Sequence, residues 1–206
     1  MAEQIAKLKK KQWYPIIAPP QFQNVVIGET PAYEPSELIG RTLTHSLMNL
    51  TNDMKKQNVN IRFKVVEVDG NNAKTSVVGY ELVPSSIKRY VRRNSEKMDL
   101  SFACDTADNV FLRIKPLIIT KADVKGSIAA KVRNTAVQFL VKTIKKMKFD
   151  ELINDLVSHK MQETLRSSLN KIYPLKVCEI RYAAIESREK EQASEAEAKE
   201  EAQTPA

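Results

Sequence analysis

Few of the residues that usually build catalytic and metal sites occur in this sequence, which has two histidines, two cysteines and five glycines among 206 residues. The motifs HExxH, CxxC, GxSxG and GxxxxGKS/T are absent. Cys104 and Cys178 lie far apart with no histidine beside them, which argues against a disulfide framework and a zinc site. Cys104 continues an alternating apolar pattern, which favours a packed thiol over a nucleophile. We therefore expect no enzyme, no cofactor and no metal site, and a reducing compartment.

Long apolar runs are also lacking. No stretch approaches the roughly 18 uncharged apolar residues of a membrane span, and residues 1–11 lack the apolar core of a signal peptide. We expect a cytosolic protein that does not enter a membrane. Hydrophobic residues make up 42% and charged residues 28% of the chain, which is close to globular usage, so wholesale disorder is excluded.

Positive charge is in excess and unevenly distributed. The net charge is +8, yet residues 186–206 hold seven glutamates against three basic side chains. Residues 1–185 hold 30 basic and 18 acidic side chains, a charge of about +12. We expect residues 186–206 to be an acidic low-complexity tail, disordered or a frayed helix, because large apolar side chains are almost absent there. The basic remainder indicates a polyanionic partner.

The pattern of apolar residues predicts one α+β domain at residues 22–185, preceded by an extended basic arm at residues 1–21. Prolines 15, 19 and 20 favour extended backbone in the arm. Alternation and turn residues predict about seven strands, mostly antiparallel, at residues 22–27, 41–50, 59–68, 73–82, 98–104, 110–116 and 175–185. Helical spacing predicts helices at residues 84–97, 126–148, 150–157 and 158–172. No homo-oligomer is expected.

Local signals refine this outline. Residues 28–40 are rich in turn formers, and residues 105–109 predict a second turn. Pro116 cannot donate a ladder hydrogen bond, so a bulge or a sheet edge is expected there. Asp150 and Ser158 are predicted helix N-caps.

Three separate basic elements favour a nucleic acid as the polyanion. On a helical wheel, Lys88, Arg89, Arg92 and Arg93 share an arc of about 140°, with apolar side chains opposite. The like-charged pairs four residues apart are unfavourable in an isolated helix, whereas phosphate contacts would stabilise them. A solvated face with scattered acidic partners is an equally open reading of this element alone.

The other two elements lie in the arm and in the long helix. The arm combines Lys7, Lys9, Lys10 and Lys11 with the rings of Trp13 and Tyr14, on which bases could stack. Packing of Trp13 onto the domain is at least as good a reading. The long helix and its end supply six further basic candidates, for which neutralisation of the helix dipole is the alternative: Lys131, Arg133, Lys142, Lys145, Lys146 and Lys148.

Residues 9–30 read KKKQWYPIIAPPQFQNVVIGET and closely resemble the N-terminal signature of the archaeal and eukaryotic small-subunit ribosomal protein family S-three-a-e, also called S-one-e. Five further segments resemble the family in the same order: SLMNLTND (46–53), FKVVEV (63–68), GYELVPSSIKRYVRR (79–93), DTADNVFLRIKP (105–116) and KIYPL (171–175). The length is typical of an archaeal member. Two segments depart from the family pattern, because residues 107–109 replace an Asp-Gly turn and residues 181–184 are less basic than the usual last strand.

The resemblance implies a mixed, barrel-like sheet with surrounding helices and no enzymatic activity. It also implies a place on the platform of the small subunit near the mRNA exit. The implied partners are small-subunit rRNA near its 3′ end and neighbouring ribosomal proteins.

The leading hypothesis is a structural rRNA-binding protein that recognises RNA shape and backbone. The alternative is a non-ribosomal RNA chaperone or translation regulator that binds transiently. An RNA-processing enzyme is a third hypothesis, but it needs a metal or a nucleophile that the sequence does not display.

Overall fold

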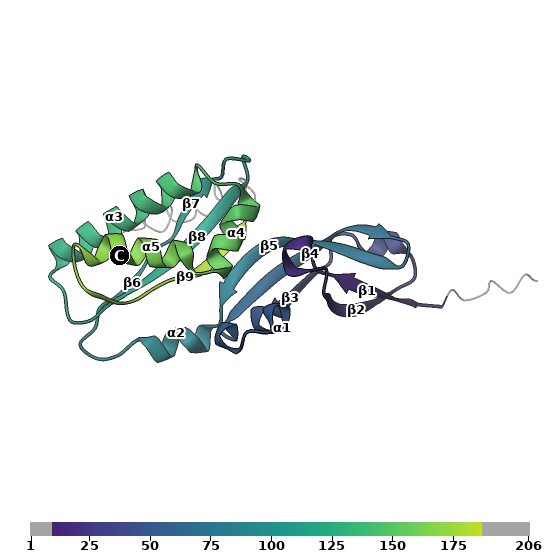
Figure 1. Cartoon of the computed structure of the whole chain (residues 1–206), viewed down its shortest axis with the longest axis horizontal. Coiled ribbons are helices and arrows are strands. Elements are labelled where there is room, and N and C mark those ends of the chain that lie inside the picture. Colours follow the sequence, from purple (N-terminus) through teal and green to yellow (C-terminus); the bar gives the residue numbers. More distant parts are fainter. Residues whose placement is uncertain (1–9, 187–206) are drawn as a thin grey trace, which may run out of the picture. The chain divides into compact units, whose positions relative to one another are not determined.

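The computed structural model describes residues 10–186, which form two compact units divided between Val78 and Gly79 (Figure 1). Lys7, Lys9 and the expected tail from residue 187 onward lie outside the described residues. Strand β5, Asn72–Leu82, contributes residues to both units. Within residues 10–186, no helix is long and apolar enough to cross a membrane.

The first unit is built from paired strands. Strand β1, Gln12–Ile17, lies antiparallel to β2, Val26–Ala32, and pairs in parallel with the start of β5. Strand β3, Thr42–Ser46, lies antiparallel to β4, Val59–Asp69. The short helix α1 spans Leu47–Thr51, and three 3-10 turns complete the unit: η1, Pro20–Phe22; η2, Pro35–Leu38; and η3, Met54–Lys56.

The core of this unit follows the alternation of its strands. Ile61, Phe63 and Val65 on β4 are fully buried, which confirms the strand predicted from their spacing. Phe63 meets Phe22 edge to face, with ring centroids 5.8 Å apart. Gly70, with φ +59°, lies in the turn that leads the chain from β4 into β5.

Two predictions for this unit are wrong. The strand expected at residues 22–27 is replaced by η1 and a turn in which Gln23 and Asn24 have φ of 58° and 54°. Ala18 N donates to Val25 O across this turn, so β2 begins later and occupies part of the expected turn region. The strand expected at residues 41–50 stops at Ser46, because the following residues turn into α1 and bury Leu47 and Leu50 against the core.

The strands of the second unit are antiparallel. The end of β5 pairs with β9, Leu175–Ile185, and β9 pairs with β8, Phe111–Thr120. On its other edge β8 pairs with β6, Lys97–Asp99, and with β7, Phe102–Asp105, which together replace the single strand expected at residues 98–104. The break faces Pro116, where β8 also has the expected register shift against β9.

Helices complete the second unit. Helix α2, Pro84–Tyr90, follows β5; α3, Gly126–Ile144, α4, Phe149–Val157, and α5, Lys160–Asn170, precede β9. Figure 1 shows α3 and α5 running beside the strands, and α5 packs on both α3 and β9. The apolar stripe predicted for α3 is confirmed, because Val132, Ala136, Leu140 and Ile144 are fully buried.

The helix caps differ from the expected ones. Helix α4 starts at Phe149 rather than after Asp150, and the Phe149 N–H donates to Asp108 Oδ2 at 3.2 Å. Helix α5 follows His159 in the left-handed conformation, with φ 60°, instead of a Ser158 cap. A side chain from a distant turn thus satisfies the first N–H group of the helix.

The α+β class is confirmed, with nine strands among residues 10–186 where about seven were expected. The pairs β1–β2, β3–β4, β5–β9, β8–β9, β6–β8 and β7–β8 are antiparallel and the pair β1–β5 is parallel, in agreement with a mostly antiparallel sheet. The hydrogen-bonded order β2-β1-β5-β9-β8-β6 is an open path, so the strands do not close into a barrel.

Candidate RNA interface

The first candidate surface is the outer side of the β1–β2 hairpin, here called the hairpin face: Lys10, Lys11, Trp13 and Tyr33. Trp13 on β1 is 63% exposed, so it does not pack into the core. Tyr33, just after β2, is 48% exposed, and Lys11 Nζ lies 5.1 Å from the centroid of its ring. Two open rings beside two lysines can stack bases and attract phosphates.

Tyr14 has a different role from the one expected. It follows Trp13 on β1 and therefore points to the opposite side of the strand, where it is 3% exposed. Its hydroxyl donates to Gln12 Oε1 at 3.2 Å. The Tyr14 ring packs in the core of the first unit, so it is not accessible to a base.

The second candidate surface is the α2 cluster, made of Lys88, Arg89, Arg92 and Arg93. All four side chains are exposed. Lys88, Arg92 and Arg93 form no ion pair with another described residue, and Arg89 Nη2 donates to Ser86 Oγ at 3.2 Å. Cations without acidic partners remain available to phosphate groups.

The expected single helical face does not form in the α2 cluster. Helix α2 ends at Tyr90 and Val91 is extended, so Arg92 and Arg93 lie in the following loop. Ser95 Oγ donates to Arg92 O at 2.7 Å, and this local turn competes with continuation of the helix. Because the helix ends at Tyr90, the two like-charged pairs four residues apart no longer face each other on one helix, and their mutual repulsion is reduced.

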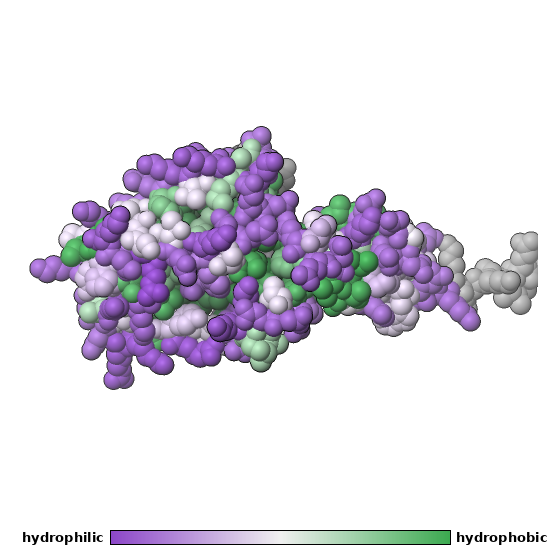
Figure 2. Space-filling view, in the orientation of Figure 1, coloured by the Kyte–Doolittle hydropathy of each residue, from purple (hydrophilic) through white to green (hydrophobic). Residues whose placement is uncertain are grey.

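The third candidate surface, the α3 cluster, contains the basic residues of α3 and its end: Lys131, Arg133, Lys142, Lys145, Lys146 and Lys148. All are exposed, and hydrophilic side chains gather over α3 in Figure 2. Arg133 is partly neutralised, because its Nη2 lies 3.3 Å from Glu96 Oε1. The five lysines form no ion pair with another described residue.

The lysines that follow α3 are held by backbone contacts. The Ala107 N–H, in the β7–β8 turn, donates to Met147 O at 3.0 Å. Together with the bond from Phe149 N to Asp108, this ties the α3–α4 junction to the turn predicted at residues 105–109. Lys145, Lys146 and Lys148 therefore project from a fixed segment, which lowers the entropy that ordering them on RNA would cost.

The described residues show few features of a catalytic site. Burial raises the pKa of Cys104 to about 11 and that of Cys178 to about 12, as fits packed thiols. Within residues 10–186, no three His, Cys, Asp or Glu side chains are grouped so that they could hold a metal ion. An α+β protein with three exposed cationic surfaces has the features of a nucleic-acid-binding protein.

The chain belongs to the Ribosomal S3Ae family, whose model matches residues 2–188. It is 32% identical over 191 residues to the small ribosomal subunit protein eS1 of Haloarcula marismortui, covering 93% of this chain and 90% of that protein. It is 34% identical over 185 residues to the eS1 protein of Nanoarchaeum equitans, covering 90% and 93%. The eS1 protein of Staphylothermus marinus is 35% identical over 174 residues, covering 84% and 82%.

These similarities confirm the family resemblance and the expected archaeal origin, because the three relatives are archaeal and match over most of their lengths. A family of structural ribosomal proteins also agrees with the expectation that the chain is not an enzyme.

Proposed function

We propose that this chain binds small-subunit rRNA through the hairpin face, the α2 cluster and the α3 cluster, as a structural protein of the small ribosomal subunit. The observation that carries this proposal is the set of exposed cations on three separate elements, in a chain whose relatives are named small-ribosomal-subunit proteins. Among them, Lys88, Arg92, Arg93 and the five lysines of the α3 cluster form no ion pair with another described residue. Phosphate contacts at several separated points fix a protein on folded RNA without reading its sequence.

The position on the subunit is a finer part of the proposal. The family resemblance of the segments at residues 9–30 and 79–93 favours the platform near the mRNA exit, with contacts to the 3′ region of the rRNA and to neighbouring ribosomal proteins. Residues 79–93 include the whole α2 cluster, and residues 9–30 include Lys10, Lys11 and Trp13.

Co-sedimentation tests the ribosomal role. Tagged full-length chain, expressed in an archaeal host, should sediment with small subunits in a sucrose gradient at physiological salt and remain there after a moderate-salt wash. A large pool at the top of the gradient would contradict the proposal and favour the free chaperone or regulator.

Crosslinking and charge removal test the surfaces. In intact subunits, crosslinks from the α2 and α3 clusters should map to rRNA in its 3′ region. The variant Lys88→Ala/Arg89→Ala should reduce retention on the subunit more than Lys160→Ala/Lys171→Ala, which removes two exposed cations at the ends of α5. Equal loss in the two variants would show that net charge, rather than the α2 cluster, governs binding.

A further inference from the structure

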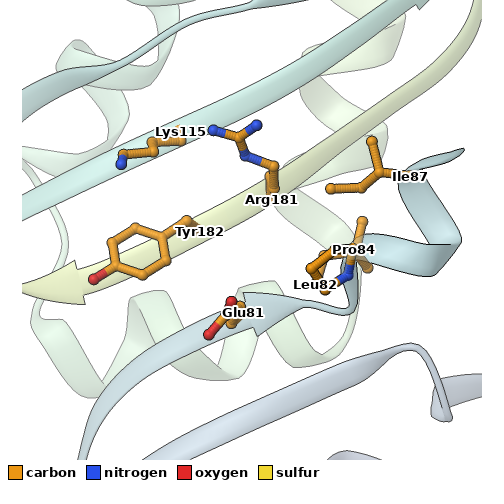
Figure 3. A pocket seen from close by; sticks show the side chains of 7 residues that line it. All are labelled: Glu81, Leu82, Pro84, Ile87, Lys115, Arg181 and Tyr182. Carbon is orange, nitrogen blue, oxygen red and sulfur yellow. The ribbon is translucent and has the colours of Figure 1, made fainter. Parts of the chain in front are cut away.

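A pocket of about 340 Å³ opens beside α2 in the second unit (Figure 3). Its floor is apolar and comes from Leu82 at the end of β5 and from Pro84 and Ile87 of α2. Its polar wall comes from the middle of the sheet, where Lys115 of β8 pairs with Tyr182 of β9. The volume is at the lower end of the range, from about 300 Å³ upward, of pockets that hold small ligands.

The polar wall is set by strand register. Tyr182 pairs with Lys115 on one side and with Glu81 of β5 on the other, so these three side chains form a row across one face of the sheet. Lys115 Nζ lies 5.1 Å from the centroid of the Tyr182 ring. In Figure 3 this ring and the ammonium group lie at one end of the pocket, and Pro84, Leu82 and Ile87 lie at the other.

Arg181 supplies a second cation at the pocket. Its Nη1 lies 3.6 Å from Asp99 Oδ1, which is a long ion pair, and Asp99 is also paired with Lys97. The Arg181 side chain is 33% exposed. A guanidinium has five donors in a planar fork, so a single loose partner leaves donors for a phosphate.

We propose that this pocket holds one unpaired nucleotide of the rRNA, with its base against the Tyr182 ring and the apolar floor, and its phosphate at Arg181 and Lys115. The inference rests on the proposed function and adds a base contact to recognition by shape and backbone. An aromatic ring beside two cations is the combination that binds single-stranded RNA.

The surroundings favour an RNA nucleotide as the occupant. Ile87 lines the pocket, while the next residues, Lys88 and Arg89, point to solvent. RNA whose backbone contacts the α2 cluster would therefore pass the mouth of the pocket. The negative charge of the Glu81 carboxylate would repel a second phosphate at this wall. The same carboxylate can accept a hydrogen bond from the amino group of a base.

The salt dependence of binding distinguishes the stacking of the base from the contacts to the phosphate. The full chain is titrated with a transcript of the small-subunit rRNA 3′ region at several salt concentrations. Tyr182→Leu should weaken binding about tenfold at every salt concentration, because this substitution removes the stacking of the base but leaves every phosphate contact in place. Arg181→Gln should reduce the slope of log K against log salt by about 0.7 to 0.9. Tyr182→Phe, which keeps the ring, should bind as the unchanged chain does.

A second measurement does not depend on any variant. Ultraviolet crosslinking of small subunits that contain the unchanged chain should join the peptide around Tyr182 to one rRNA nucleotide, identified by mass spectrometry. A crosslink from this peptide to another protein, or equal binding by the Tyr182→Leu and Tyr182→Phe variants, would overturn the proposal.

The two proposals fail differently. If the Lys88→Ala/Arg89→Ala variant loses affinity while Tyr182→Leu does not, the base contact is wrong and the proposed function stands. If the unchanged chain does not bind the transcript and is absent from small subunits, the proposed function is wrong and the pocket proposal falls with it.

Discussion

At the scale of single residues, Glu179 on β9 has an environment that is unusual for a carboxyl group. Burial raises its pKa to about 7, although Arg166 acts in the opposite direction. His159 Nδ1 lies 3.7 Å from its Oε2, beyond hydrogen-bond distance. Gln162 is 3% exposed beside it, and its Nε2 already donates to Leu156 O at 3.2 Å. The folded chain therefore favours the protonated form of Glu179 until the pH reaches about 7.

This environment predicts a pH-dependent stability. The folded pKa lies above the unfolded value near 4.5, so the folded state holds the extra proton between these values. The free energy of unfolding should therefore fall as pH rises from about 4.5 to about 7, by about 3 kcal/mol at most, and then level off. Glu179→Gln should remove this fall and exceed the unchanged chain in stability at pH 8. Denaturant unfolding of both chains at several pH values measures the difference, and parallel curves would contradict the assignment.

The two thiols allow a second prediction. With pKa values of about 11 and about 12, Cys104 and Cys178 hold at most about a thousandth of their thiols as thiolate at pH 8. Neither should react with a disulfide reagent in the folded chain within the time of the assay, and both should react in denaturant. Absorbance of the released thiol measures this, and rapid reaction of one cysteine in the folded chain would show that its strand opens.

At the scale of elements, the strength of the periodic signal determined how well the sequence predicted each one. Strand β4 and helix α3 were predicted because each sets one long apolar side against a core. The run at residues 41–50 was predicted as one strand, since its apolar residues could not show that Leu47 and Leu50 share one side of a helical turn. The break between β6 and β7 depends on Pro116, which is distant in the sequence.

The pairing of β5 with β9 predicts the effect of a substitution. Gly79 faces Ala184 across these strands, and a Cβ at Gly79 would lie 2.9 Å from the Ala184 Cβ and 3.2 Å from Ala183 O. Gly79→Val should lower the free energy of unfolding by about 1 to 3 kcal/mol, because the strands must separate. Thermal unfolding measures this loss.

A matched pair of variants tests the cause of that loss. Gly79→Ala should destabilise less than Gly79→Val, and adding Ala184→Gly should recover part of the stability by removing the opposing Cβ. Gly28 is a control because a Cβ there meets nothing within 4 Å. Gly28→Ala should not lower the stability, because alanine at a compatible backbone position reduces the conformational entropy of the unfolded chain. Equal losses for Gly28→Ala and Gly79→Ala would contradict crowding as the cause.

At the scale of the whole molecule, the sequence predicted the charge of the candidate surfaces better than their chemistry. Lysine and arginine side chains are exposed almost regardless of fold, so the members of the α2 and α3 clusters were found from the sequence. Which aromatic rings are open depends on strand register, which exposes Trp13 and buries Tyr14. The pocket at Tyr182 was missed because its walls come from three segments that only the sheet brings together.

The charge distribution gives the last prediction, the salt dependence of RNA binding by the full chain. If each of the three surfaces neutralises about two phosphates, the slope of log K against log salt should be about −4 to −5, and affinity should fall about a thousandfold from 50 to 200 mM salt. Lys142→Gln/Lys145→Gln/Lys146→Gln should make the slope shallower by up to about 1.8, the share of two phosphates, whereas Lys160→Gln/Lys171→Gln should leave it unchanged. Filter binding to the 3′-region transcript measures the slopes. A slope near zero for the unchanged chain would contradict electrostatic binding, and the same slope in both variants would exclude the α3 cluster from the interface.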